Sequence, residues 1–269
     1  MSLHEGRLAR PRGTLVHSAL AATALAVVAC QDVPPVPPGG AAAPAAKPGS
    51  ARATATEPAN GDVLGAIAGR RASFRRAFLS APDDAARSAV RKEAARYLES
   101  ALIDAVLPRW DGTPWSFSGT SATPRTGSIA CGYFVSTTLE EAGLRVERRR
   151  LAQQPAEDII ETLAPPEAIA RFSDVPVEKF EAAVAARGDG LYVVGLDIHV
   201  GFLVVRGGEV LFHHSSYVGP TAVVREQARA SSPLVQSRYR VIGKLFTDDA
   251  LVEAWLRGTP VPTKVRARR

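Results

Sequence analysis

A Pro-, Ala- and Gly-rich stretch from Gln31 to Asn60 limits which part of this 269-residue chain can form a core. Two Pro-Pro pairs lie near its start. Such a segment cannot bury enough apolar surface to offset its ordering entropy, so we expect a disordered or semi-extended spacer at residues 30–61. The folded part is then residues 62–260, which is ample for one core, and residues 261–269 form a basic tail.

The segment before the spacer has the pattern of an export signal. Three arginines before residue 13 precede an apolar run from Leu15 to Ala29, which is shorter than a membrane span of about 20 residues. The run ends in Val27-Val28-Ala29-Cys30, which resembles a bacterial lipobox. We therefore expect residues 1–29 to be a signal peptide and Cys30 to carry a lipid. An ordinary signal peptide cleaved nearby is the alternative.

This expectation also sets the location of the protein. We expect the protein to be exported to the bacterial cell envelope and held to a membrane through its lipid anchor. Gln31, rather than Asp, follows the cysteine, which favours the outer over the inner membrane by analogy with sorting in diderm bacteria.

The charge distribution argues against a nucleic-acid partner. The formal net charge is +6, but two of these charges lie before residue 30 and four lie after residue 263. The body of the chain is therefore neutral. Phosphate binding needs Lys and Arg clustered on a folded surface, so we expect no nucleic-acid-binding face.

Hydrophobic periodicity predicts an α+β domain with an antiparallel sheet, because helices come first and strands later. The loop Trp110–Gly127 lies between the first two predicted helices. Helices are expected at Asp83–Val106, Cys131–Ala142, Ala156–Leu163, Val177–Ala186 and Asp248–Leu256. Strands are expected at Leu191–Leu196, His199–Val205, Glu209–Ser215 and Tyr239–Phe246, the second and third forming a hairpin through Arg206-Gly207-Gly208.

Cys131 is the only cysteine besides Cys30, and it begins a predicted helix. A helix N-terminus favours a thiolate and lowers the pKa of its thiol. Gly132 directly after it leaves room for a substrate to approach. A buried, unreactive thiol is the alternative, and a Cys30–Cys131 disulfide is a third possibility.

A cysteine nucleophile needs a histidine base, which a third polar group must orient. His199 begins a strand, and Gly201 two residues on allows substrate or backbone to come near. His214 shares the apolar side of the next strand with Phe212, so it is expected to point inward as the orienting group. His213 is the alternative. No carboxylate or second cysteine stands at ligand spacing, so neither a metal nor a cofactor is expected.

Four segments in the same order resemble the NlpC-type cell-wall peptidases, which are small papain-like cysteine endopeptidases. Together they span roughly residues 109–217. Gly112–Thr120 resembles the family's G-T-P-Y-x-W-G-G-T, Ala130–Val135 its D-C-S-G-F-V, His199–Phe202 its H-V-G-I, and Phe212–Ser216 its strand end I-H-A-S. The chain departs from the family at Ala130, where Asp is usual, and at Trp115, where a pocket Tyr is usual. Its segment from 145 to 187 is also longer.

The resemblance implies a papain-like domain with helices packed on an antiparallel sheet and the nucleophile at a helix N-terminus. It implies hydrolysis of an amide bond in peptidoglycan stem peptides by Cys131, His199 and His214, with Trp115, Gly132 and Gly201 at the substrate. We expect a monomer. The alternatives are a papain-like amidase or acyltransferase with another substrate, and a non-catalytic wall-binding or envelope-assembly lipoprotein.

The anchor can be tested directly. Cys30→Ser removes the acylated thiol, so the protein should move from the membrane fraction to the soluble fraction, since stable attachment requires two or more acyl chains. Fractionation of cells that express each form measures this. An unchanged distribution would contradict the anchor.

Overall fold

The computed structural model describes residues 60–264 of the chain. The expected signal peptide, the lipidation site Cys30 and nearly all of the expected spacer lie outside the described residues, as do residues 265–269 of the expected tail. Within the described part, no helix combines the length and the apolar character that crossing a membrane requires.

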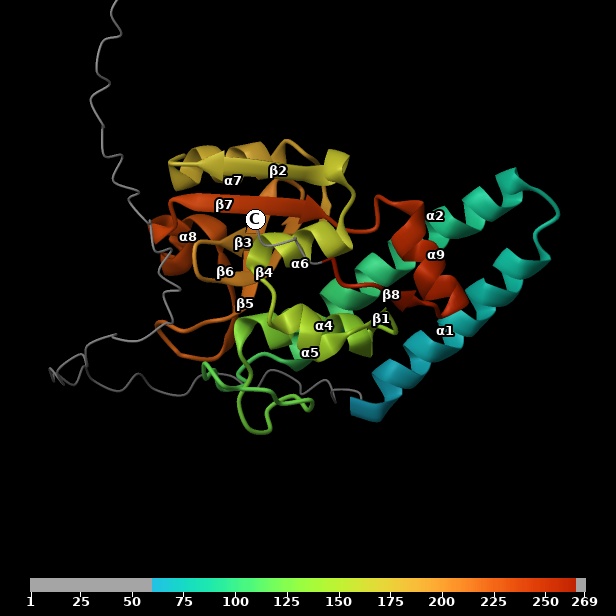
Figure 1. The fold of residues 1–269 in the computed structure, drawn as a ribbon, viewed down its shortest axis with the longest axis horizontal. Helices are drawn as coiled ribbons and strands as arrows, with labels where there is room; N and C mark the ends of the chain where they lie inside the picture. The colour runs from blue at the N-terminus through green and yellow to red at the C-terminus, as the bar shows by residue number, and fades with distance from the viewer. Residues whose placement is uncertain (1–59, 265–269) are drawn as a thin grey trace, which may run out of the picture. The chain divides into compact units, whose positions relative to one another are not determined.

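A six-stranded sheet forms the centre of the domain (Figure 1). Its strand order is β2-β7-β3-β4-β5-β6, and every neighbouring pair is antiparallel. The strands are β2 (Ile169–Ser173), β3 (Gly190–Leu196), β4 (Val200–Arg206), β5 (Glu209–Ser215), β6 (Val223–Gln227) and β7 (Tyr239–Lys244). A short parallel pair, β1 (Arg145–Val146) with β8 (Pro260–Val261), lies outside this sheet and continues the ordered chain past residue 260.

Helices precede, interrupt and follow the strands. The first two are α1 (Asn60–Ser80) and α2 (Asp84–Ala101), and α2 continues through a π-helical turn (Leu102–Val106) into α3 (Leu107–Arg109). The others are α4 (Cys131–Glu141), α5 (Arg148–Ala152), α6 (Ala156–Leu163), α7 (Val177–Ala185), α8 (Ser232–Gln236) and α9 (Asp249–Arg257). Short 3₁₀ turns occur at Pro166–Ala168 and Ala228–Ala230.

The predicted α+β class with an antiparallel sheet is confirmed, and each predicted helix and strand is present within a few residues of its expected bounds. The sequence patterns missed α1, the short helices α5 and α8, both edge strands and the β1–β8 pair. The edge strands β2 and β6 are short and contain exposed charged side chains such as Arg171 and Arg225, so they lack the continuous apolar run of β3 and β4.

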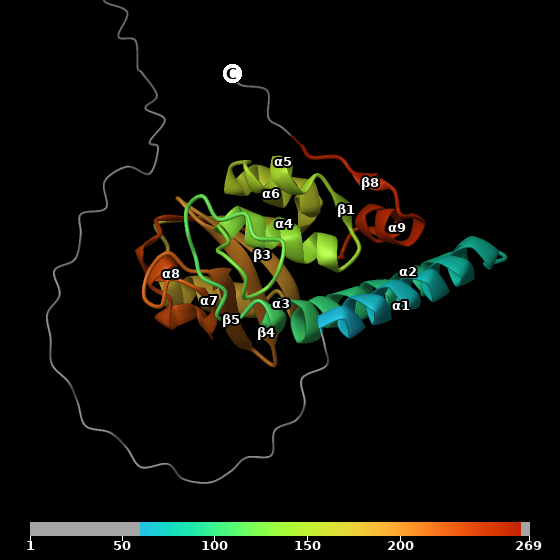
Figure 2. The same ribbon diagram turned by 90° about the horizontal axis from the view of Figure 1, so that it is seen from below.

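The sheet has a core on each face, and the two cores are covered by different helices (Figure 2). On one face, which we call the α4 face, the Phe134 ring of α4 lies 5.9 Å from the Phe202 ring of β4, and α6 packs on β3 and β7. On the other face, which we call the α7 face, Phe180 of α7 and Leu234 of α8 belong to the buried cluster that includes Phe212. Alternate residues of the buried strands serve the two cores.

A helical hairpin of α1 and α2 extends to one side of the sheet and packs against α9 (Figure 1). Three aromatic rings join these helices: Phe74, Tyr97 and Trp255 lie with ring centroids 5.7–6.4 Å apart. The Trp255 indole N–H donates to the carbonyl of Ala142, the C-cap of α4. Through Trp255, α9 and the helical hairpin packed on it therefore support the C-terminal end of α4, opposite Cys131.

Arg240 of β7 is a buried cation that fixes α8 on the α7 face. It is 2% exposed, and its guanidinium donates to the carbonyls of Leu234 in α8 (2.7 and 3.0 Å) and Val175 before α7 (2.6 Å). Burial lowers the pKa of Arg240. These hydrogen bonds therefore connect β7 to α8 and to the segment before α7.

We expect Arg240→Met to lower the free energy of unfolding by about 2–4 kcal/mol, since it leaves one buried and one partly buried carbonyl without this donor while keeping most of the side-chain volume. Arg238→Met is the matched control two residues away. The Arg238 side chain is 82% exposed and pairs with an exposed Asp174, so its loss should cost less than about 0.5 kcal/mol. Urea unfolding of both variants measures the difference, and equal losses would contradict the role of Arg240.

Candidate active site

Three side chains from the β4, β5 and β6 segments form a hydrogen-bonded chain on the α7 face, buried at its two histidines and 35% exposed at Glu226. His199 Nε2 lies 2.8 Å from His214 Nδ1, and His214 Nε2 lies 3.1 Å from a carboxylate oxygen of Glu226. His199 directly precedes β4, His214 is on β5, and Glu226 is on β6. His199 is 3% exposed and His214 is fully buried. The structure therefore brings together two of the residues expected from the sequence and adds a third that was not expected.

Close packing holds the two imidazoles in place. The Phe212 ring stacks on His214 with centroids 3.9 Å apart and planes 11° from parallel, and it meets His199 edge-on. A Cβ at Gly201 would lie 2.7 Å from both His214 Cβ and the Phe212 ring. Gly201 thus provides the space that the stacked rings occupy, which explains this glycine without a substrate.

A tight β3–β4 hairpin turn positions His199. The Leu196 N–H donates to the His199 carbonyl across the turn (2.8 Å). Asp197 in the turn accepts from the Ser237 hydroxyl (2.9 Å) and from the backbone N–H groups of Arg238 (2.7 Å) and Tyr239 (3.2 Å). One carboxylate therefore ties the turn before His199 to the chain after α8.

The chain of hydrogen bonds determines where the protons lie. The Glu226 carboxylate only accepts, so His214 Nε2 must donate to it. In a neutral His214 the other nitrogen, Nδ1, is then an acceptor, and His199 Nε2 donates to it. A neutral His199 is left with Nδ1 as its acceptor nitrogen. That is the protonation state a general base requires.

Burial keeps both histidines neutral near pH 7. It lowers the pKa of His199 well below its ordinary value of 6.5, and the neighbouring His214 lowers it further. Burial also lowers the pKa of His214, although the Glu226 carboxylate opposes that effect. The hydrogen bond from His214 lowers the pKa of Glu226, which keeps its carboxylate ionised.

Cys131 is the first residue of α4, and it packs half-buried against the core of the α4 face. The segment before it is held by hydrogen bonds: the Ser215 hydroxyl donates to the Ile129 carbonyl (2.7 Å), and the Ala130 N–H donates to Gly119 (2.9 Å). Ser215 follows His214 at the end of β5, beside the start of β4. The beginning of α4 is therefore attached at the same end of the β4–β5 hairpin as the two histidines.

The thiol and the histidine pair come from opposite sides of this hairpin. α4 covers the face that carries Phe202 and His213, whereas His199 and His214 lie with Phe212 on the α7 face. An approach between Cys131 and His199 is thus confined to the strand ends. Gly132 beside the thiol faces α5, where a Cβ would lie 2.2 Å from the Ala152 carbonyl oxygen. Close helix packing explains Gly132 without a substrate.

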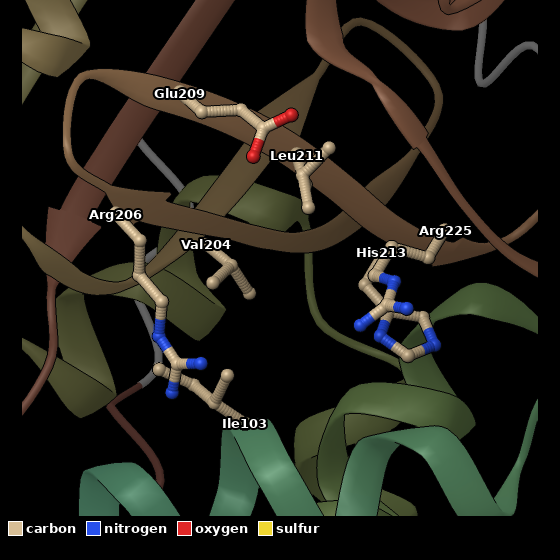
Figure 3. Close-up of a pocket in the computed structure, with 7 residues that line it drawn as sticks. All are labelled: Ile103, Val204, Arg206, Glu209, Leu211, His213 and Arg225. Carbon is tan, nitrogen blue, oxygen red and sulfur yellow. The ribbon is translucent and has the colours of Figure 1, made fainter.

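His213 takes a different place from His214. Its Nε2 lies 2.6 Å from an Asp111 carboxylate oxygen, and its ring lies 5.6 Å from that of Phe134 on the α4 face. It borders a separate hollow of about 180 Å³, where Figure 3 shows it beside Arg225, with Arg206 and Ile103 across the space. His214 is therefore the histidine of this pair that contacts His199.

Trp115 is connected to the site through Tyr217. The Trp115 and Tyr217 rings lie 6.2 Å apart, and the Tyr217 ring meets that of His199 edge-on at 5.2 Å. Backbone hydrogen bonds hold the Trp115 segment beside the start of β6. Trp115, expected at the substrate, thus lies one aromatic ring away from His199.

Glu226 and Tyr217 were not found by sequence reasoning. If β6 had been recognised, the alternation of side chains along β5 would have located Glu226. Glu226 pairs with Phe212, so it lies on the same face of the sheet as His214. β6 itself is short and contains Arg225, Glu226 and Gln227, so its pattern is that of a loop.

Comparisons with known proteins do not place this chain in a family. No protein-family model, no curated protein and no solved structure matches it.

The two depressed histidine pKa values predict how stability depends on pH. The unfolded chain binds protons at these histidines below about pH 6.5 while the folded state does not, so their stabilising contribution is present above that pH and is lost as the pH falls. We expect thermal unfolding midpoints to fall between pH 7.5 and 5, because the free energy of unfolding decreases by at most about 1.4 kcal/mol per pH unit for each histidine.

The variant carrying both His199→Asn and His214→Asn should show a shallower fall over the same pH range. Calorimetry at several pH values measures both proteins. A wild-type midpoint that stays constant or rises as the pH drops would contradict the buried neutral pair, whether or not the double variant folds.

Proposed function

We propose that this protein is a cysteine hydrolase that cleaves an amide bond through an acyl-enzyme on Cys131. The observation that carries the proposal is the His199–His214–Glu226 chain, because it leaves His199 Nδ1 as an acceptor at the end of the sheet to which the start of α4 is attached. A papain-like arrangement of these elements is part of the proposal. The antiparallel sheet and the thiol at the start of a helix support it.

The reaction follows the chemistry of a thiol nucleophile with a histidine base. His199 Nδ1 takes the proton from Cys131 Sγ, and the thiolate attacks the amide carbonyl carbon. Backbone N–H groups in the first turn of α4, which have no partner within the helix, stabilise the oxyanion. The C–N bond then breaks, the amine leaves with the proton from His199, and water hydrolyses the thioester.

His214 and Glu226 act through His199 in this scheme. When His199 accepts the thiol proton, the imidazolium has its Nε2–H directed at His214 and the charge of Glu226 beyond it. The carboxylate stabilises positive charge that develops in a buried site. Glu226 is therefore a positioning residue that fixes the tautomers of both histidines, with no contact to the substrate.

The substrate class rests on the resemblance to NlpC-type peptidases over roughly residues 109–217. It supports peptidoglycan stem peptides as the substrate and the bacterial cell envelope as the place of action. The lipobox-like Val27-Val28-Ala29-Cys30 agrees with that location, since a lipid anchor and a spacer place an enzyme next to the cell wall.

The catalytic set predicts a graded loss of activity on peptidoglycan fragments. Cys131→Ala should reduce kcat by about 10⁴-fold or more, and His199→Ala by nearly as much, because a nucleophile and its base act as a unit. His214→Ala should cost less, since His214 transfers no proton to the substrate. Full activity in Cys131→Ala would rule out the proposal.

Glu226→Gln keeps a hydrogen-bond acceptor and removes only the charge. It should lower kcat by about 10- to 100-fold and move the acidic limb of the pH profile, because it withdraws the carboxylate that favours imidazolium. Glu209→Gln on β5 is the matched control, since this exposed carboxylate bonds to Gln227 away from the histidines. A loss with an unmoved pH profile would mean that Glu226 is only structural.

A further inference from the structure

We infer that the substrate carries an apolar group of about six carbons on the acyl side of the bond that is cleaved, and that a groove beside His199 receives it. This inference rests on the cysteine-hydrolase chemistry of the proposed function, and it favours an acyl substrate other than a stem peptide, the alternative that the sequence analysis leaves open. The groove has a volume of about 180 Å³ and is bordered by the β3–β4 turn, Tyr217 and α8. His199 itself forms part of its wall.

The polar groups that line the groove are already occupied by other parts of the protein. The Asp197 carboxylate accepts three hydrogen bonds, one of them from the Ser237 hydroxyl, and two from backbone N–H groups. The Gln236 side-chain amide donates to the Ser232 hydroxyl (2.7 Å). The Asp197 contacts hold the turn to the chain after α8, and the Gln236 contact lies within α8.

The remaining wall is apolar. Leu196, Ile198, Tyr217 and Pro233 supply carbon surface around His199. Ile198 is 64% exposed although it directly precedes a buried histidine. It is one of the four large apolar side chains that are exposed in the described part of the chain. Apolar surface held open beside a reactive group is typical of a binding site.

The volume sets the size of the group. A cavity of about 150 Å³ lined by apolar side chains accepts one benzene molecule. The His199 groove therefore suits a six-carbon chain or a side chain of similar size. The methyl side chain of an alanine would fill only a small part of it. We place the group on the acyl side because the acyl-enzyme holds that half of the substrate next to His199.

The reaction of the full chain with p-nitrophenyl acetate, butyrate, hexanoate and decanoate tests this. Each ester transfers its acyl group to Cys131 Sγ and releases p-nitrophenolate, which is measured by its absorbance. Full burial of one methylene is worth about fourfold and half burial about twofold, so kcat/KM should rise roughly 15-fold from acetate to hexanoate and level off by decanoate.

Ile198→Ser should lower kcat/KM about fivefold more for hexanoate than for acetate, because only the longer chain reaches the groove wall. Ile198 is mostly exposed, so the variant should fold, and its unfolding midpoint checks this. Leu79→Ser is the matched control, since Leu79 is a 57% exposed apolar side chain on α1, outside the groove.

The outcomes separate the two proposals. Release that persists in Cys131→Ala, or none from the wild type, would overturn the proposed function and the inference with it. Release that depends on Cys131 but is the same for all four esters would overturn only the apolar subsite. An equal effect of Ile198→Ser on acetate and hexanoate would overturn it as well.

Discussion

The hydrogen bond between two buried, neutral imidazoles is the interaction around which this sheet is arranged. Desolvation makes a charged histidine costly at this position, and an unpaired neutral one would leave polar nitrogens unsatisfied. His199 and His214 satisfy each other at 2.8 Å, and Glu226 takes the remaining N–H of His214. The arrangement requires a strand without a side chain at Gly201, because the stacked rings of Phe212 and His214 fill that space.

Several separate segments converge on the end of the sheet where this pair lies. Asp197 ties the β3–β4 turn to the chain after α8, and Arg240 holds α8 itself through the Leu234 carbonyl. Ser215 attaches the start of α4 to the end of β5. Each of these contacts joins residues more than five positions apart, so the geometry around His199 depends on the folded sheet as a whole and on no single element.

The neighbours His213 and His214 show how strand geometry separates adjacent side chains. Successive side chains point to opposite faces, so His214 joins His199 on the α7 face while His213 meets Asp111 and Phe134 on the α4 face. A carboxylate partners each of them. The same alternation places α4 with its thiol and the histidine pair on opposite faces of the sheet. The two can approach each other only at the ends of the strands, where the proposed chemistry would take place.

The sequence by itself determined the elements and their local parity. Helical spacing marked α4 and α6, the Arg206-Gly207-Gly208 turn marked the β4–β5 hairpin, and alternation put His214 with Phe212. The helices, the hairpin turn and the alternation of side chains depend on interactions between residues that are close in the sequence. Only the tertiary structure decided that Glu226 completes the histidine chain, that Gly132 packs on Ala152, and that Arg240 positions α8. Such contacts depend on strand order and on which helix covers which face, and packing between distant segments sets both.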